Sequence, residues 1–267
     1  MRRYDADNQT HVDHLQRYVV GDGALPRRTR YGSTEAANLG LQPLGDMPDK
    51  LLDPADFKEA IAYAHEHRVM PMYHQARSWA PDGFKYNQDG LPYCWTWSGT
   101  ATLMDCRATE GKPTVPLAPV SMGWLVGWRS RGNYLESYIK GAREEGVAPA
   151  ECCGGINSHN RDPDDFDPAW KTERKKYRLD EVWDCDSRDM VRHAVSCLCY
   201  GVPVYIAYNW WRHALELVGV RWDESQRNNV VWQIRNSHNE DDLIELTGSR
   251  GVPSEAFGFV STKATGA

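Results

Sequence analysis

The sequence predicts an α+β fold, because helical patterns fill the middle of the chain and strand patterns gather near its C-terminus. Three late segments, VPVYIA, HALELVGV and NVVWQIRN, alternate with period two and are rich in Val, Ile, Leu and aromatic residues, as strands are. Helices are predicted earlier, over CWTWSGTATLMDCRA and over GNYLESYIKGAREEG. Helices followed by a run of strands are typical of this fold class.

The last two predicted strands are expected to form a hairpin around the polar loop RWDESQRN. If Val220 pairs with Asn229, His213 then lies opposite Asn236. Directly opposed residues have Cβ atoms about 4.5–5.5 Å apart, close enough for an amide to hold an imidazole. The strand pattern therefore predicts a contact between His213 and Asn236.

Cys94 is the candidate nucleophile, because it follows the turn residues of YNQDGLP and begins a predicted helix. A thiol attacks as the thiolate, so its pKa must fall from about 8.5 to about 3.5–7.5, which a base and a helix N-terminus favour. His213 is the candidate base, and Asn236 could hold its tautomer by accepting the other ring proton. Gln88 and the backbone N–H of Cys94 could bind the oxyanion. Together these residues predict amide hydrolysis.

The motifs around these residues resemble those of the papain-like (C1 family) cysteine peptidases. NQDGLPYCW is similar to the family signature NQGxCGSCW, RHALELVGV to HAVxxVGY, and IRNS to KNSWG. By this resemblance Cys94 is the nucleophile and His213 the general base and acid. Asn236 is the orienting residue, and Gln88 is the oxyanion-hole donor.

The resemblance spans roughly Pro71 to Ala256 and implies a two-lobe fold with the active-site cleft between the lobes. A helical lobe is expected over about 94–180. An antiparallel, β-barrel-like lobe is expected over about 181–262. The expected partner is a peptide or protein substrate.

Three departures from the family pattern concern substrate binding and the surroundings of the His–Asn pair. Leu91 replaces the half-cystine before the nucleophile, and His238 replaces a Trp that follows the Asn by two residues. The stretch RSRGN around Gly132 replaces a CxGG motif that binds substrate backbone in the family. Gly132, Trp95 and Trp211 are the predicted substrate-binding residues, and the cleavage preference is left open.

Residues 1–70 lie outside the resemblance and are expected to pack on, or to cover, the catalytic unit at 71–267. One helix is predicted there, over LDPADFKEAIAYAHEH, with Asp53 as the N-cap and Pro54 at its first position. Its apolar face consists of Phe57, Ile61 and Ala64. Permanent packing on a lobe is favoured over a removable pro-segment, because the long charged helix of such pro-segments is missing.

Composition excludes several classes of protein. The chain has 267 residues, 41% of them hydrophobic, which suits one catalytic unit of two lobes. A net charge of −6 supplies no basic field for nucleic acid, and no run of apolar residues is long enough to cross a membrane. The N-terminal MRRYDADNQTH lacks the apolar core of a secretory signal.

Seven cysteines, an odd number, do not suggest a disulfide framework. A reducing location, cytoplasmic or within a protein assembly, is therefore expected. Zinc could be imagined at Cys152, Cys153, His159 and Cys185, but no CxxC pair supports it, so no metal and no cofactor is predicted.

Two alternatives to hydrolysis stay open from the sequence. The fold could be retained as a structural or interaction component of a larger assembly, for example a viral particle, with weak or no catalysis. The acyl group could also be transferred to an amine instead of water.

Overall fold

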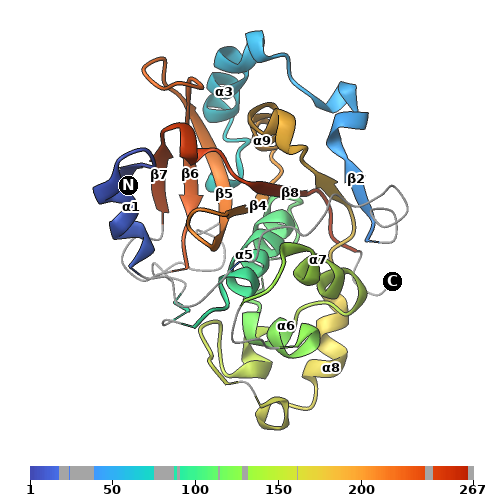
Figure 1. Ribbon diagram of the computed structural model, residues 1–267. Coiled ribbons are helices and arrows are strands. Elements are labelled where there is room, and N and C mark those ends of the chain that lie inside the picture. The colour runs from blue at the N-terminus through green and yellow to red at the C-terminus, as the bar shows by residue number, and fades with distance from the viewer. Residues whose placement is uncertain are drawn as a thin grey trace.

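Helices pack on both faces of a single mixed sheet in the computed structural model (Figure 1). The structure describes residues 1–17, 24, 39–74, 87–88, 91–113, 115–127, 132–160, 162–237 and 243–263. The helices are α1 (Gln9–Gln16), α3 (Phe57–Glu66), α5 (Cys94–Thr109), α6 (Pro119–Val126), α7 (Leu135–Glu144), α8 (Trp170–Glu173) and α9 (Met190–Cys199). The predicted α+β class is confirmed.

The sheet has eight strands in the order β1-β7-β6-β5-β4-β8-β3-β2. The strands are β1 (Arg2–Asp5), β2 (Leu41–Pro43), β3 (Val182–Asp184), β4 (Val204–Tyr208), β5 (His213–Trp222), β6 (Val230–Arg235), β7 (Leu243–Thr247) and β8 (Glu255–Phe259). The inner pairs are antiparallel, whereas β1 runs parallel to β7 and β2 parallel to β3.

Alternate residues of the central strands face two separate hydrophobic cores. In β4, Tyr205 and Ala207 lie in the core that α5, α6 and α7 share. The intervening residues, Val204, Ile206 and Tyr208, lie in the core that contains α3 and α9. Because helices cover both of its faces, the sheet is buried through its centre, and α6, α7 and α8 gather beyond α5 as a helical lobe (Figure 1).

The predicted helix after the turn at position 92 is α5, and Cys94 is its first residue. All of its residues from Cys94 to Arg107 are buried. A helix buried on every side belongs in the centre of a domain, and α5 lies between the sheet and the helical lobe (Figure 1).

The first 70 residues contribute to the sheet as well as covering it. β1 and β2 form its two edges, although the predicted β lobe began only at residue 181. The predicted helix is α3, preceded by a turn in which Asp53 accepts a hydrogen bond from the N–H of Ala55 at 2.9 Å. Its buried residues are Phe57, Ile61 and Ala64, and it packs on β5 and α9.

The predicted hairpin is β5 and β6, but its predicted register is wrong. Val220 pairs with Trp232 instead of Asn229, and the register shifts once more between Leu217 and Gly219. The strands continue to the pair Trp222–Val230, so the loop starts two residues later than predicted, and the polar letters RWDESQRN do not indicate this. The bulge then adds one further shift, which sequence alternation does not reveal either. β6 ends at Arg235, so Asn236 follows the strand instead of lying opposite His213 within the ladder.

All seven cysteines are free thiols, six of them buried. Within the described ranges, no three His, Cys, Asp or Glu side chains lie close enough to share a metal ion. No helix among the described residues combines the length and apolarity that a membrane crossing needs.

We predict that Gly99→Ala lowers the free energy of unfolding by about 1–3 kcal/mol, as overpacking a core does. A Cβ at position 99 would lie 2.5 Å from Cδ1 of Tyr138, a side chain with no exposed surface. Urea unfolding would measure the loss. Gly251→Ala is the control, because its Cβ would come no closer than 3.7 Å to Leu246. Equal stability of the two variants would contradict this account of the α5–α7 contact.

Candidate active site

The thiol of Cys94 lies against the start of β5. A tight turn leads into α5, in which Leu91 N–H donates to Gln88 O at 3.0 Å and Tyr93 N–H donates to Leu91 O at 2.8 Å. The Cys94 Sγ then accepts a hydrogen bond from the N–H of Ala214 at 3.3 Å. Since Ala214 directly follows His213, the helix N-terminus brings the predicted nucleophile next to the predicted base.

His213 is hydrogen-bonded to Asn236, as the residue types predicted. The imidazole Nε2 lies 2.9 Å from Oδ1 of Asn236. The same oxygen accepts the N–H of Ser237 at 2.8 Å, which fixes the orientation of the amide. A carbonyl oxygen can only accept, so Nε2 carries the ring proton, and Nδ1 is the nitrogen with a basic lone pair.

Gln88 connects the turn before α5 to the end of β6. Its backbone N–H donates to Ser237 O at 3.0 Å, and the Ser237 hydroxyl donates to Gln88 Oε1. The amide Nε2 donates one hydrogen to Leu91 O at 2.6 Å. An amide nitrogen has two hydrogens, so Gln88 keeps a second N–H with which to bind an oxyanion.

The three predicted substrate-binding residues lie near this cluster but are buried. Trp95, which follows the nucleophile, is 0% exposed, and Trp211 is 1% exposed. The Trp211 ring packs on the His213 ring with centroids 5.1 Å apart. Gly132 is buried and has a φ of +75°, a backbone conformation that favours glycine. Their roles in binding substrate remain predictions.

Ala24 contacts the residues next to two predicted site positions, His213 and Gly132, although no sequence motif marks it. Its N–H donates to the carbonyl of Arg212 at 3.1 Å, and it pairs with Asn133 in an isolated parallel bridge. Arg212 precedes His213, and Asn133 follows Gly132. Ala24 is 4% exposed and belongs to the same core as Cys94. An alanine in a loop-like stretch carries no sequence signal for such a contact.

Burial of the site opposes ionisation of the thiol. Cys94 and His213 are both 0% exposed. Burial raises the pKa of Cys94 to about 12, although hydrogen bonds from the N–H groups of Ala214, Trp95 and Cys94 itself pull it down. This rise in the pKa is opposite to the fall expected for a catalytic thiol, and it results from the exclusion of water from the site. With this pKa, Cys94 is a neutral thiol at pH 7.

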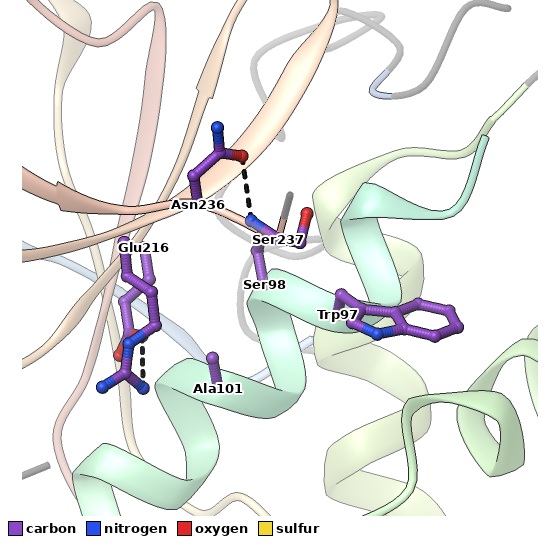
Figure 2. Close-up of a pocket in the computed structure, with 7 residues that line it drawn as sticks. Trp97, Ser98, Ala101, Glu216, Asn236 and Ser237 are labelled. Atoms are coloured by element: carbon purple, nitrogen blue, oxygen red, sulfur yellow. Dashed lines mark hydrogen bonds and ion pairs between the residues drawn. The ribbon is translucent and has the colours of Figure 1, made fainter. Parts of the chain in front are cut away.

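A buried charge cluster lies behind Asn236, between α5 and the strands. Arg235 Nη1 lies 3.6 Å from Asp105 Oδ2 and 3.6 Å from Glu216 Oε2. Figure 2 shows the surrounding side chains, with Ser98 and Ala101 of α5 on one side and Glu216 of β5 and Asn236 on the other. The space between these side chains is too small for a water molecule. The cluster therefore serves to fasten β5 and β6 to α5, not to admit a substrate.

The fold is similar to that of solved cysteine proteases, although no sequence match accompanies the similarity. No protein-family model and no curated protein sequence matches the chain. ProCathepsin B S9 from Trypanosoma congolense is structurally similar, with a TM-score of 0.57 and 13% identity over 95% of this chain and 89% of that chain. Procathepsin L2 from the larval midgut of Tenebrio molitor gives 0.57 and 12%, over 91% and 78%.

A third structure, the proform of the ragweed pollen cysteine protease Amb a 11, gives a TM-score of 0.52 and 15% identity. That match covers 66% of this chain and 62% of the ragweed chain, less than two thirds of its length. At such low sequence identity, the structural similarity shows the fold alone and not the activity. The chain therefore has the fold of the papain-like cysteine proteases, with helical and β-rich parts that meet at Cys94 and His213.

Proposed function

We propose that the protein is a cysteine-type peptidase that hydrolyses peptide bonds through Cys94, His213 and Asn236. One observation carries the proposal. The Cys94 thiol accepts a hydrogen bond at 3.3 Å from the residue that follows His213, and His213 itself contacts Asn236 at 2.9 Å. A nucleophile next to a base that a third group orients is the arrangement nucleophilic catalysis needs.

Acylation would begin with transfer of the thiol proton to Nδ1 of His213. The Cys94 sulfur attacks the scissile carbonyl, a C–S bond forms, and the carbonyl electrons move onto its oxygen. Gln88 Nε2–H and the backbone N–H of Cys94 stabilise that oxyanion. The intermediate then collapses, the C–N bond breaks, and His213 gives its proton to the departing amine.

Deacylation would use the same groups in reverse. A water molecule attacks the thioester while His213 Nδ1 accepts one of its protons. The C–S bond breaks, the product acid leaves, and the proton returns to the sulfur. Asn236 holds the imidazole through Nε2 in both halves, so that Nδ1 keeps facing the reaction.

We further propose that the form described here is latent, because the chain at Ala24 covers the cleft. Its contacts are with Arg212, next to His213, and with Asn133, and it belongs to the same hydrophobic core as Cys94. A neutral thiol with a pKa of about 12 fits a resting state. Proforms occur among the structurally similar proteases, as the Amb a 11 and Trypanosoma congolense structures illustrate.

A second candidate function is that of a structural or interaction component without catalysis. The complete burial of Cys94 and His213 favours it, since an inactive site has no need of access. Against it stands the hydrogen bonding of Gln88, His213 and Asn236, which packing alone does not require. Uncovering the cleft separates the two functions, because only a peptidase gains turnover from it.

We predict that Ala24→Pro activates the Cys94 thiol. Proline has no N–H, so it cannot donate to Arg212 O, and access of water lowers the thiol pKa. In the unchanged chain, a pKa of about 12 makes alkylation of Cys94 rise about tenfold per pH unit from pH 6 to 9. In Ala24→Pro, Cys94 should be labelled at pH 6 at least tenfold faster than in the unchanged chain, and the labelling rate should depend only weakly on pH.

Ala24→Gly is the matched control, because it keeps the N–H that bonds to Arg212. Mass-detected labelling with an epoxide inhibitor of papain-like enzymes would follow Cys94 separately from the other thiols. Identical labelling of Ala24→Pro and Ala24→Gly at every pH would contradict the covering role of Ala24.

We predict that Cys94→Ala, made in the Ala24→Pro chain, abolishes hydrolysis of fluorescein-labelled casein. Gln88→Ala should lower kcat by about 10² to 10³, the usual cost of losing one oxyanion-hole donor. Cys199→Ala, at a partly exposed free thiol, is the control and should retain full turnover. Casein hydrolysis at the parent rate by Cys94→Ala would rule out this mechanism.

A further inference from the structure

We propose that Trp211 is a positioning residue for the His213 imidazole, and that the N-terminal helix α1 holds it in place. The inference rests on the proposed function and extends it, because it makes residues 1–16 part of the catalytic unit. The feature that carries it is the short connection between β4 and β5. Residues 209–212 form this connection and deliver His213 to the site.

The connection is a strained turn. Trp211 N–H donates to Tyr208 O at 3.1 Å, which closes it. Arg212 then has a φ of +53°, a conformation that costs a residue with a side chain about 1–2 kcal/mol. Strained conformations persist only where their surroundings fix them. The backbone of His213 is placed by its pairing with Tyr208 in the β4–β5 ladder, so contacts with this turn act on the orientation of its side chain.

Trp211 provides the contact with the imidazole itself. Its ring packs on the His213 ring with centroids 5.1 Å apart and planes inclined by 46°. Both side chains are at most 1% exposed. Water next to Nε2 would compete for the hydrogen bond to Asn236, and the indole is large enough to exclude it.

The last turn of α1 holds the two tryptophans of the connection. The indole Nε1–H of Trp211 donates to Leu15 O at 2.9 Å. Gln16 Nε2 donates to the carbonyl of Trp210 at 2.7 Å. Leu15 O is among the last carbonyls of a helix, which have no partner within the helix. The bond to Trp211 thus satisfies both groups and sets the plane of the indole.

α1 is fixed independently of Trp211. β1, just before it, pairs with β7 over four residues. The Asp7 carboxylate accepts the backbone N–H groups of Ser249 at 2.6 Å and Arg250 at 3.1 Å. The Arg250 carbonyl accepts Trp210 Nε1–H at 2.8 Å. The first residues of the chain, the connection at 209–212 and the turn after β7 therefore form one interlocked unit behind His213.

The test compares Trp211→Phe with Trp183→Phe in the full chain. Both changes keep an apolar ring and lose one indole donor; Trp183 Nε1–H donates to Glu181 Oε1 at 2.9 Å, a bond outside the candidate site. The first readout is exchange of the His213 Nε2–H with water, followed by NMR in ¹⁵N-histidine protein and assigned with His213→Ala. We expect at least tenfold faster exchange in Trp211→Phe and an unchanged rate in Trp183→Phe.

The second readout is epoxide labelling of Cys94 in the Ala24→Pro background across pH 5 to 8. Trp211→Phe should lower the labelling rate about tenfold and shift its pH profile, whereas Trp183→Phe should change neither. Gln16→Ala removes only the hydrogen bond from an exposed side chain to Trp210 O. It should change exchange and labelling in the same directions as Trp211→Phe, by about two- to fivefold. It decides the matter if Trp211→Phe does not fold.

Unchanged exchange and labelling in Trp211→Phe, with only a loss of stability that Trp183→Phe shares, would overturn the inference. Absence of labelling in every chain, the Ala24→Pro parent included, would instead contradict the covering role of Ala24, and absence of casein hydrolysis by a parent that is labelled would overturn the proposed function. In that case the exchange measurement still decides whether Trp211 and α1 hold His213.

Discussion

The contact between the first turn of α5 and Ala214 is the constraint on which the candidate site depends. The backbone of Ala214 uses both of its groups there, donating its N–H to Cys94 Sγ and accepting the hydroxyl of Ser98 at 2.7 Å. Tyr205 of the neighbouring strand donates its hydroxyl to Trp95 O at 2.6 Å. Because backbone groups and a buried tyrosine fix α5 on β5, the approach of Cys94 to His213 follows from the fold and not from the two side chains alone.

Access of water to Cys94 and His213 decides how reactive the thiol is. A thiolate and an imidazolium are charged, and burial without water disfavours both of them, as the raised pKa of Cys94 shows. Elsewhere in the interior, Arg235 offsets the same cost by its contacts with Asp105 and Glu216. Cys94 has no such fixed cation in contact among the described residues, so its ionisation depends on whether the cleft is open. The covering proposed for Ala24 would therefore control the reactivity of Cys94 without moving any of the residues proposed to be catalytic.

Sequence patterns predicted the features that local physics determines. The helix at Cys94, the helix α3 with its face of Phe57, Ile61 and Ala64, and the existence of the β5–β6 hairpin follow from turn residues and periodicity. The predicted cap, Asp53, caps the 3-10 turn before α3 and not α3 itself. The hairpin register does not follow from these patterns, because β5 continues through Arg221 to Trp222, residues whose letters read as loop. The further shift next to Gly219 depends on tertiary packing, since a Cβ there would lie 2.5 Å from Gln233 Oε1. β1 and β2, with four and three residues, are too short to show alternation. Their pairing is a long-range property.

The two edge strands make the N-terminal residues part of the fold. β1 lies at one edge of the sheet and β2 at the opposite edge, and α1 is hydrogen-bonded to Trp211 next to His213. Loss of all the first 70 residues would therefore remove both edges of the sheet together with the contact to Trp211. The latent form proposed for this protein asks for much less, because only the contacts of Ala24 with Arg212 and Asn133 would have to break. A change at Ala24 can therefore test that proposal while β1, α1 and β2 keep their contacts with the rest of the chain.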